Sequence, residues 1–429
     1  MDNHDAFALL RGLFDVAVAA ASPGQCLAPH LERLEPARGR TIVVGAGKAA
    51  AAMARTVEEV LGGPPKSMLE GLIVPRAKPG VPLSWIECVE ARHPVPDERG
   101  LAAAGRIVQL LRNLSPDDRV IALISGGGSA LLSAPAPGLS LLDKQSVNRA
   151  LLASGAPIGA MNVVRKHLSA IKGGQLAIAA RPARLVGYLI SDVPGDDPGV
   201  IASGPTVADA STYADALAVL ARYRIDPPPA VLNHLREGAA GRIAETPKPG
   251  DPRLDHVLTT MVVTPAKALD AAATAASAAG FRPILLGDAL EGLSRDLAAR
   301  HAGLIRDLAR RGERIAVISG GETTVEVTGN GSGGRDVEYL LALAIGLDGL
   351  ADVWSLAADT DGVDGAAEIA GARISPDTLT RAKARGIDAA ARLADNDCHG
   401  FFQALGDSIV TGPTRTNVND FRVSLIAPR

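Results

Sequence analysis

The stretch TIVVGAGKAAAAMA, residues 41–54, joins an apolar run to an alanine-rich run through a turn that contains Gly45 and Gly47. The apolar run predicts a buried strand and the alanines predict a helix, which together form one unit of an α/β fold. Glycines after a strand let the backbone approach a ligand, and the first turn of a helix offers N–H groups to an anion. Gly45, Gly47 and Ala50 also fit the dinucleotide pattern G-x-G-x-x-A. The turn therefore predicts a site for a phosphate-bearing ligand.

The surrounding residues favour a polyphosphate over a dinucleotide at this turn. A dinucleotide site places an acidic residue at the end of the next strand to bond the ribose, whereas the next apolar run ends Val74-Pro75-Arg76. Lys48 adds a compact positive charge suited to phosphoryl transfer, although the full P-loop spacing is absent. Two alternatives stay open, a purely structural turn and an NADP site in which Arg76 holds the 2′-phosphate.

The alternation of apolar runs with helical stretches continues along the chain and predicts two domains. A proline-rich segment at residues 245–253 is typical of a linker. We therefore expect a Rossmann-like α/β/α domain over residues 1–253 and a smaller α/β domain with a mixed sheet over residues 254–429. The further strands are predicted at residues 71–76, 119–128, 184–192, 282–288, 314–321 and 351–359, with an antiparallel extension or hairpin at residues 323–329 and a helix at residues 264–280.

The composition is that of an ordinary globular protein rather than a disordered or nucleic-acid-binding chain. The 429 residues are 47% hydrophobic and 21% charged, and the formal net charge is −3 without a block of Lys or Arg. The three cysteines are scattered, which argues against a disulfide framework and a zinc site. No uncharged apolar run approaches the roughly 18 residues that span a bilayer, and the N-terminus lacks the pattern of a signal peptide. We expect a cytoplasmic protein without a membrane or nucleic-acid partner.

Two further glycine motifs are candidates for binding an anion. SGGGSALL begins at residue 125, directly after a predicted strand, and its successive N–H groups could form an anion nest. A flexible surface loop is the alternative. In AIKGGQLA, Lys172 precedes Gly173 at a bend that begins or interrupts a helix, where the lysine could reach a ligand or remain solvated. The nest residues are Ser125, Gly126, Gly127, Gly128 and Ser129.

Charged residues at strand ends and glycine loops supply the remaining candidates. Asp192 follows a predicted strand, at the edge where open α/β sheets bind ligands. Glu322 follows a second Ser-Gly-Gly turn, and Arg335 opens a helix after a glycine loop, where its fork would suit a phosphate or carboxylate. A surface ion pair with Glu338 is the alternative for Arg335.

Two polar loops near the C-terminal end complete the candidate site. AADTDGVDG, residues 357–365, lacks the calcium-loop pattern, so its carboxylates, Asp361 among them, are expected to share Mg²⁺ or position a hydroxyl. In TGPTRTNVND, Asn417 could contact a ligand or simply close the turn.

Taken together, these motifs resemble the glycerate 2-kinase family, which pairs an N-terminal glycerate-kinase domain with a C-terminal MOFRL domain. Its members often carry the label hydroxypyruvate reductase. The resemblance runs nearly from end to end, in family order. It is carried by GAGKAA, RHPVPD, SGGGSALL, IKGGQLA, DVPGDDPGVIASGPT, SGGETTV, GSGGRDVE, DTDGVDG and TGPTRTNVND.

The resemblance implies ATP- and Mg²⁺-dependent transfer of a phosphoryl group to the 2-hydroxyl of D-glycerate, in a cleft between the two domains. It places the catalytic lysine on Lys48 and the catalytic arginine on Arg335. The other polar positions map onto four residues, with Glu322 and Asp361 as candidates to orient the hydroxyl and Asp192 and Asp361 as candidates for Mg²⁺. These four are Asp192, Glu322, Asp361 and Asn417. A homodimer is compatible with the sequence.

The sequence departs from the family pattern at three positions. The family loop usually reads GGRN followed by an amide residue, whereas this chain has Asp336 and Val337, and Arg415 stands where glycine is common. The extra carboxylate and the extra cation could alter substrate preference, so a hydroxy acid similar to glycerate is the alternative substrate. Two other functions also remain open. One is an NADPH-dependent hydroxypyruvate reductase with His93 as proton donor, and the other is a non-catalytic nucleotide-binding module.

Overall fold

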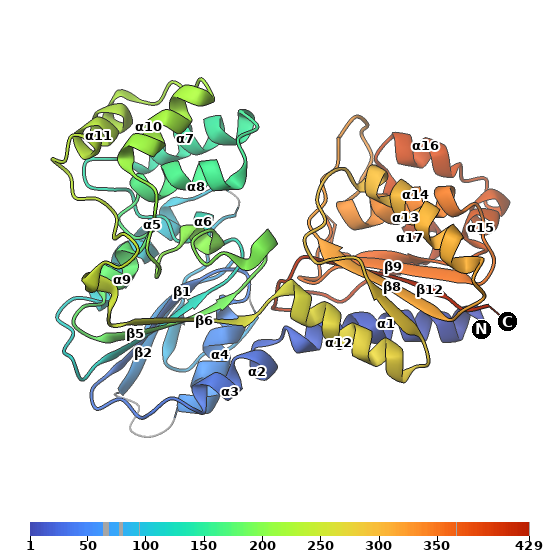
Figure 1. Ribbon diagram of the computed structural model, residues 1–429, viewed down its shortest axis with the longest axis horizontal. Coiled ribbons are helices and arrows are strands. Elements are labelled where there is room, and N and C mark those ends of the chain that lie inside the picture. Colours follow the sequence, from blue (N-terminus) through green and yellow to red (C-terminus); the bar gives the residue numbers. More distant parts are fainter. Residues whose placement is uncertain (63–67, 77–79, 94, 366, 429) are drawn as a thin grey trace. The chain divides into compact units, whose positions relative to one another are not determined.

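The computed structural model describes residues 1–62, 68–76, 80–93, 95–365 and 367–428, which form two compact units. One unit is Pro23–Val262, and the other combines Met1–Ser22 with Val263–Arg429. Each unit contains one six-stranded sheet with helices on its faces (Figure 1). The predicted α/β class, with a Rossmann-like first sheet and a mixed second sheet, is confirmed.

The first sheet has the strand order β3-β2-β1-β4-β5-β6, and β1 to β5 run parallel to one another. Every residue of β1 and β4 is buried, as expected for central strands covered on both faces. The strands are β1 (Thr41–Ala46), β2 (Leu69–Val74), β3 (Ile86–Cys88), β4 (Arg119–Ile124), β5 (Arg184–Ile190) and β6 (Val257–Val263).

The helices of this unit form two groups. One group lies against the sheet, with α5 and α9 on one face and α2 to α4 on the other, while α7, α8, α10 and α11 pack together around a core of their own (Figure 1). The helices are α2 (Pro23–Cys26), α3 (Ala28–Leu31), α4 (Ala50–Leu61), α5 (Glu98–Leu110), α6 (Gly128–Leu131), α7 (Leu141–Ala153), α8 (Ile158–His167), α9 (Gln175–Ala179), α10 (Tyr213–Arg222) and α11 (Pro229–Ala239), with 3₁₀ turns η2 (Pro194–Asp196), η3 (Ile201–Ser203) and η4 (Pro252–Leu254).

The second sheet has the order β11-β10-β9-β12-β8-β7, in which only β7 and β8 form a parallel pair. Helices α13, α14 and α17 lie on one face, and α1 and α12 lie on the other (Figure 1). The strands are β7 (Arg282–Leu285), β8 (Ile315–Gly321), β9 (Val353–Asp359), β10 (Gly371–Ile374), β11 (Ser408–Ile409) and β12 (Asp420–Ile426). The helices are α1 (Asn3–Ala20), α12 (Pro265–Ala278), α13 (Ser294–Ala309), α14 (Arg335–Leu347), α15 (Thr378–Ala384), α16 (Ala389–Ala394) and α17 (Cys398–Leu405).

The compact units are not the same as the predicted segments 1–253 and 254–429. Helix α1 packs against α12, and Phe14 makes an edge-to-face contact with Phe421, with 6.0 Å between ring centroids. Strand β6, which follows the proline-rich segment, completes the first sheet. The proline-rich segment therefore connects two parts of one unit, because the strand after it still pairs with β5.

The antiparallel extension or hairpin predicted at residues 323–329 does not form. The backbone there makes one isolated bridge, between Leu293 and Thr324, and the side chain of Val327 is 76% exposed. The amides of Thr328 and Gly329 instead donate to Asn396 Oδ1, at 2.9 and 2.8 Å. The alternating pattern favours a strand, but the side-chain amide of Asn396 rather than a partner strand accepts the hydrogen bonds of this backbone.

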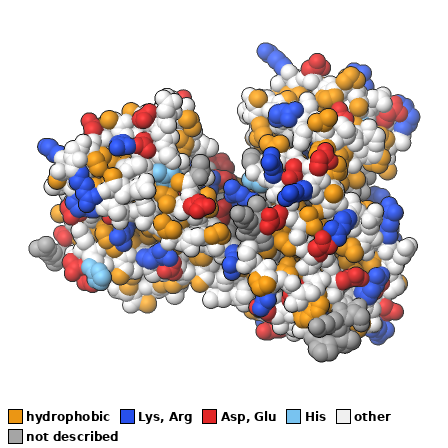
Figure 2. Space-filling view, turned by 180° about the vertical axis from the view of Figure 1, so that it is seen from behind, with side chains coloured by type: hydrophobic (Ala, Val, Ile, Leu, Met, Phe, Trp, Pro, Cys, Tyr) orange, Lys and Arg blue, Asp and Glu red, His pale blue; other side chains and the backbone are white. Residues whose placement is uncertain are grey.

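Lys, Arg, Asp and Glu side chains are interspersed over the face shown in Figure 2. An anionic ligand therefore has to be recognised by local groups rather than by a broad field. No single helix in the described ranges is long and apolar enough to cross a membrane, and only the bent pair of Asn3–Ala20 with Pro23–Leu31 passes that test of length and composition.

Candidate active site

The turn after β1 and the loop after β4 are hydrogen-bonded to each other. Lys48 N donates to Gly126 O at 2.8 Å, and Ser125 N donates to Ala46 O at 3.1 Å. Ser125 Oγ accepts from Ala49 N at 3.0 Å. Strands β1 and β4 are neighbours at the point where the strand order reverses, and open α/β sheets bind ligands just beyond the carboxyl ends of such strands. The structure thus brings two of the predicted motifs together at the expected edge.

Gly45 and Gly47 are explained by close packing between these strands. A Cβ on Gly45 would lie 2.2 Å from Leu123 O, and one on Gly47, where φ is +135°, would lie 2.1 Å from Ser125 Oγ. The amide of Gly47 donates to Val74 O at 3.2 Å. Because the amides of residues 47 to 50 all donate to acceptors within the protein, the predicted amide cradle does not form at this turn. The turn instead presents the partly exposed side chain of Lys48.

Available amides lie in the glycine loop after β4. Gly127 has the left-handed conformation, with φ +79° and ψ −9°, and it precedes the short helix α6. Within the described part of the chain, the amides of Gly127 and Ser129 meet no hydrogen-bond acceptor, and both residues are partly exposed. A Cβ placed on Gly127 would lie 3.2 Å from His93 Cδ2 and 3.7 Å from Lys48 Cγ. This loop therefore combines open N–H groups with a neighbouring lysine, as an anion nest requires.

The loop after β5 packs directly onto this nest. Ser203 Oγ lies 2.8 Å from Ser129 Oγ and donates to Asn162 Oδ1 at 3.0 Å. Ala202 and Ser203 have positive φ values of 50° and 62°, a strained conformation for residues other than glycine. Such strain is concentrated at functional sites, where the surrounding structure holds it in place. The nest is therefore supported by a backbone that several contacts constrain.

Lys172 and Gly173 donate hydrogen bonds to the backbone of this strained loop. Gly173 N donates to Ser203 O at 3.0 Å, and Lys172 Nζ donates to Ala202 O at 3.4 Å. Lys172 is only 2% exposed, and burial, followed by the charges of Lys144 and Arg165, lowers its pKa well below the usual value. In this geometry Lys172 supports the loop, and a direct contact with ligand stays a prediction.

Asp192 lies where the sequence predicts it, just beyond the end of β5. It is partly exposed, and β5 is the parallel neighbour of β4. Its carboxylate is therefore at the same edge of the sheet as Ser125. Further along this loop, the carboxylate of Asp197 accepts a hydrogen bond from Gly199 N at 2.8 Å, which closes a turn.

Arg335 is the centre of a separate cluster in the other unit. Its Nε, Nη1 and Nη2 atoms donate to three different carboxylates, so every nitrogen of the guanidinium has an anionic partner. The acceptors are Asp420 Oδ1 at 2.6 Å, Glu322 Oε1 at 2.7 Å and Asp359 Oδ2 at 2.8 Å. The predicted residues Arg335 and Glu322 are thus in contact, whereas the alternative partner Glu338 pairs with Arg295 at 3.1 Å.

The charges of this cluster fix the protonation state of Arg335. Burial opposes its charge, but Asp420, Asp359 and Glu322 raise its pKa above the ordinary value. Glu322 is the most accessible partner, with a side chain that is 50% exposed against 5% for Asp359 and 0% for Asp420. An incoming anion could therefore replace Glu322 more readily than either aspartate.

Asp359 and Asp420 were not among the predicted site residues. They face each other in the antiparallel register of β9 and β12, strands that are far apart in sequence. The predicted Asp361 instead accepts from Val363 N at 2.8 Å, and its own amide donates to Asp359 Oδ1 at 2.9 Å. The Asp-x-Asp spacing could have indicated Asp359 as the site residue. Asp359 is the last residue of β9 and is held by the sheet, whereas Asp361 lies in the turn that follows.

Asn417 and Arg415 lie in the turn before β12. Asn417 is 2% exposed, and its Oδ1 accepts from Asn419 N at 3.4 Å. This hydrogen bond is the one expected if Asn417 closes the turn. A contact between Asn417 and a ligand stays a prediction. Arg415 has φ +66°, which explains why glycine suits this position in related sequences.

Asp336 and Asp364 are buried carboxyl groups behind Arg335. Neither oxygen of Asp336 has a hydrogen-bond partner among the described residues, and its nearest cation is Arg422, with Nε 3.7 Å from Oδ1. Asp364 accepts from Val337 N at 2.9 Å. Burial and then Asp420 raise the pKa of Asp336 well above its usual value, and burial raises the pKa of Asp364 to about 7. Both shifts favour the protonated, uncharged form of these carboxyl groups, which reduces the negative charge that Arg335 and Arg422 have to balance.

Comparisons with known proteins place this chain among its relatives. Residues 9–236 match the family described as a domain of unknown function (DUF4147), and residues 315–420 match the MOFRL family. A D-glycerate 2-kinase of Thermotoga maritima is 37% identical over 96% of both chains. A protein of Agrobacterium vitis with the provisional label hydroxypyruvate reductase is 50% identical over 97% of this chain and 94% of its own. The crystal structure of a glycerate kinase from Thermotoga maritima superimposes with a TM-score of 0.88 at 36% identity, covering 99% of this chain and all of that one.

Proposed function

Because this chain belongs to the glycerate 2-kinase family, we propose that it transfers the γ-phosphoryl group of ATP to the 2-hydroxyl of D-glycerate. The observation that carries the proposal is the nest beside Lys48. Two amides without acceptors in the described chain, those of Gly127 and Ser129, lie next to a lysine at the reversal point of a parallel sheet. This combination suits a phosphate whose charge is redistributed during transfer.

We assign the phosphates of ATP to the nest and to Lys48. Phosphoryl transfer depends mainly on positioning and on neutralising charge, and both are available there without covalent catalysis. Ser129 Oγ, which contacts Ser203, adds a hydroxyl to the same edge. The backbone of Lys48 is held by its bond to Gly126, and its side chain brings a compact positive charge to the same edge.

We assign the glycerate to Arg335, whose fork can hold a carboxylate in two parallel hydrogen bonds. Since three carboxylates occupy the guanidinium in this structure, binding requires that one of them moves, and Glu322 is the most exposed. A displaced Glu322 would be free to orient the attacking hydroxyl. Asp361 remains the other candidate for that role.

Magnesium is proposed to enter with ATP. Among the described residues, no group of three or more His, Cys, Asp or Glu side chains is arranged to hold a metal ion. Mg²⁺ in kinases is usually held by one or two carboxylates together with the phosphates and water, so a cage made only of protein is not needed. Asp192, at the edge that carries the nest, fits this single-carboxylate role, and Asp361 is the second candidate.

The hydroxypyruvate reductase alternative lacks support in the geometry. A dinucleotide turn needs open amides after β1, and here those of residues 47 to 50 are occupied. No acidic residue ends β2, which runs Leu69–Val74 and is followed by Pro75 and Arg76. Neither feature favours a bound NADPH.

One pair of assays tests the proposal. The purified full-length protein is incubated with ATP, Mg²⁺ and D-glycerate, and the products are separated to distinguish 2-phosphoglycerate from 3-phosphoglycerate. A parallel reaction contains NADPH and hydroxypyruvate. We expect 2-phosphoglycerate and no oxidation of NADPH. ATP binding without turnover would support the nucleotide-binding module instead, and oxidation of NADPH would support the reductase. A cytoplasmic location and a homodimer belong to the same proposal, and light scattering tests the latter.

A further inference from the structure

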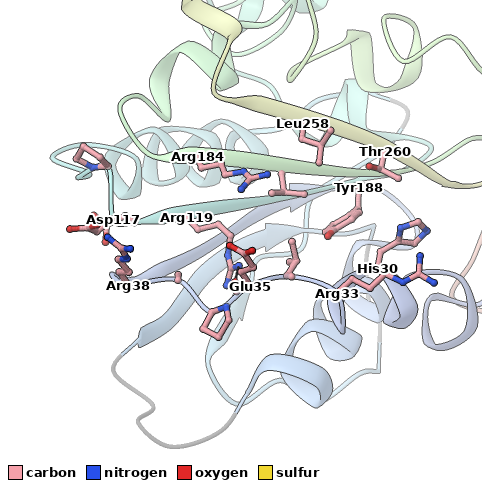
Figure 3. Close-up of a pocket in the computed structure, with 16 residues that line it drawn as sticks. His30, Arg33, Glu35, Arg38, Asp117, Arg119, Arg184, Tyr188, Leu258 and Thr260 are labelled. Atoms are coloured by element: carbon pink, nitrogen blue, oxygen red, sulfur yellow. Dashed lines mark hydrogen bonds between the residues drawn. The ribbon is translucent and has the colours of Figure 1, made fainter.

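The first unit contains a cavity at the end of the sheet opposite to the nest. It encloses about 590 Å³ and lies beside the first residues of β4 and β5 and along β6 (Figure 3). Arg119, which lines it, is the first residue of β4, whereas the glycine loop follows Ile124, the last. With a rise of roughly 3.3 Å per residue, the two ends of β4 are about 16 Å apart. The cavity is therefore separate from the loops to which we assign ATP.

The cavity lies between one face of the sheet and the chain from His30 of α3 to Arg38. Arg184 and Tyr188 of β5 point to the cavity, as do Leu258 and Thr260 of β6 (Figure 3). Val186, which lies between the two β5 residues in the alternation of the strand, also lines the cavity. The intervening residues of β4 and β5 enter the hydrophobic core formed with α5 and α9. The segment that follows α3 closes the cavity, and the ring of His30 lies 6.1 Å from that of Tyr188.

Arg119 is the most unusual group in this lining. It is only 9% exposed, yet no carboxylate pairs with it in the described part of the chain. Its Nη1 and Nη2 donate to Glu35 O at 2.6 Å and Thr41 Oγ1 at 3.2 Å, and its buried Nε has no acceptor among the described residues. A buried guanidinium is costly unless an anion compensates it, which points to an anion that this chain does not itself supply.

The other charged side chains of the lining also favour the binding of an anion. Arg33, Arg38 and Arg184 are exposed and form no ion pair with any described residue. Against the four arginines stand Glu35 and Asp117 on the rim, since Asp118 is already engaged. Four positive charges against two negative charges leave the cavity cationic.

Asp118 is engaged by its own loop and does not neutralise the arginines of the cavity. Its Oδ1 accepts from Arg40 N at 2.7 Å, and its Oδ2 accepts from Ser115 N at 2.8 Å. Burial opposes its ionisation, but these hydrogen bonds lower the pKa of Asp118 to about 2. Its charge is therefore matched by backbone donors and by Arg40 Nη2, which lies 3.5 Å from Oδ2.

A second hollow continues the cavity across Arg184. It encloses about 390 Å³ and shares Pro116, Arg184 and Leu258 with the first. Sites for small organic ligands usually measure about 300 to 1,000 Å³, so either hollow alone has a suitable size. Arg184 lies between them, where it can bind an anionic group from either side.

We propose that this cavity binds a small organic anion with phosphate or carboxylate groups, held by Arg119 and Arg184 and covering Tyr188. The guanidinium fork matches both groups in geometry. The exposed side chain of Leu258, at 50%, and the ring of Tyr188 offer apolar surface to the carbon skeleton. The site is independent of the assigned kinase activity, so each can fail without the other.

Isothermal titration calorimetry of the full-length protein with citrate and with 3-phosphoglycerate tests the proposal. We expect at least one probe to bind with a Kd below about 1 mM. The double variant Arg33→Glu and Arg184→Glu should weaken that binding at least tenfold, and both residues are exposed, so the fold should tolerate the change. Arg149→Glu, on the exposed face of α7, is the matched control and should leave binding unchanged.

Lys48→Ala distinguishes this cavity from the nest, because it should spare the calorimetric signal. Binding that Lys48→Ala abolishes and the double variant spares would place the anion at the nest and overturn the proposal. Absence of binding by either probe at 10-fold above that Kd limit would also overturn it. Arg119→Met, with its fold checked by thermal unfolding, should abolish binding by removing the buried donor.

Discussion

The two units use opposite means to prepare for a charged substrate. In the unit 23–262, the candidate site consists of open amides, hydroxyls and one lysine, with a strained backbone behind them. In the other unit, Arg335 is enclosed by three carboxylates, and two further carboxyls lie behind it. The first site presents donors to a ligand, with the partly exposed Asp192 at the same edge of the sheet, whereas the second already encloses its arginine in carboxylates. Loss of a residue should therefore affect mainly activity in the first and mainly stability in the second.

Lys48→Ala should give the largest effect. We expect kcat/KM to fall about 1,000-fold, or about 4 kcal/mol, because the amides alone cannot neutralise the transferring phosphate. Stability should change by less than about 1 kcal/mol, since the backbone of Lys48, through its bond to Gly126, joins the two loops. Steady-state kinetics and urea unfolding measure the two quantities. Lys383→Ala, on the exposed side of α15, is the control. Near-normal activity of Lys48→Ala would remove the contrast between the units.

Arg335→Met should show the opposite balance of effects. Removing the guanidinium leaves Asp359, Asp420 and Glu322 without their common partner, and breaking such a buried pair costs about 3 kcal/mol. Arg310→Met removes an ion pair of similar length, 2.9 Å, in which both side chains are more than two-thirds exposed. That control should cost less than about 1 kcal/mol.

The two tryptophans allow this loss to be assigned to one unit. Trp85 belongs to the first unit and Trp354, which lies in β9, to the second. In a Trp85→Phe background, urea unfolding followed by fluorescence reports the second unit alone. If Arg335→Met left the unfolding transition reported by Trp354 unchanged in this background, the carboxylate cluster would not be a source of stability in the second unit.

Asp336→Asn should stabilise the second unit at neutral pH. A carboxyl with a raised pKa binds more protons in the folded state, so stability falls as pH rises from its unfolded pKa to its folded pKa. For Asp364, whose pKa is about 7, this window runs from about pH 4 to about pH 7. An uncharged amide at position 336 removes the cost of burying the Asp336 carboxyl, whose pKa is also raised by burial. The free energy of unfolding should therefore rise by on the order of 1–2 kcal/mol at pH 7.5.

The pH profile of unfolding checks this sign. Wild-type protein should be more stable at pH 5 than at pH 8 in the Trp354 signal, and Asp336→Asn should reduce that difference. Asp270→Asn, exposed on α12, should leave the profile unchanged. A variant that is less stable than wild type at pH 7.5 would show that Asp336 is ionised and paired with Arg422.

The sequence allowed most of the fold to be predicted, but only part of the site. Buried strands such as β1 and β4 are continuous apolar runs, so their position follows from local composition. The contact between Arg335 and Asp420 depends on the pairing of β12 with β8 and β9, which local pattern does not encode. The occupied amides after β1 could not be foreseen for a similar reason, because their acceptors include the loop after β4. The spacing of the glycines indicates that another group approaches the backbone of this turn closely. Only the structure shows that this group is the protein itself, at Leu123 and Ser125, and not a ligand.

Gly127→Ala should give the smallest effect and makes the sharpest test of the nest. At φ +79°, an alanine costs about 1 kcal/mol, and its Cβ would lie 3.2 Å from His93, next to the open amides. Gly138→Ala is matched, because its φ is +85° but no described atom lies within 4 Å of its Cβ. Both variants should lose similar stability, yet only Gly127→Ala should lower kcat/KM for ATP, by about tenfold. Equal activity in the two variants would mean that the amides of this loop do not contact phosphate, and the assignment of ATP to this edge would then depend on the side chains of Lys48 and Ser129.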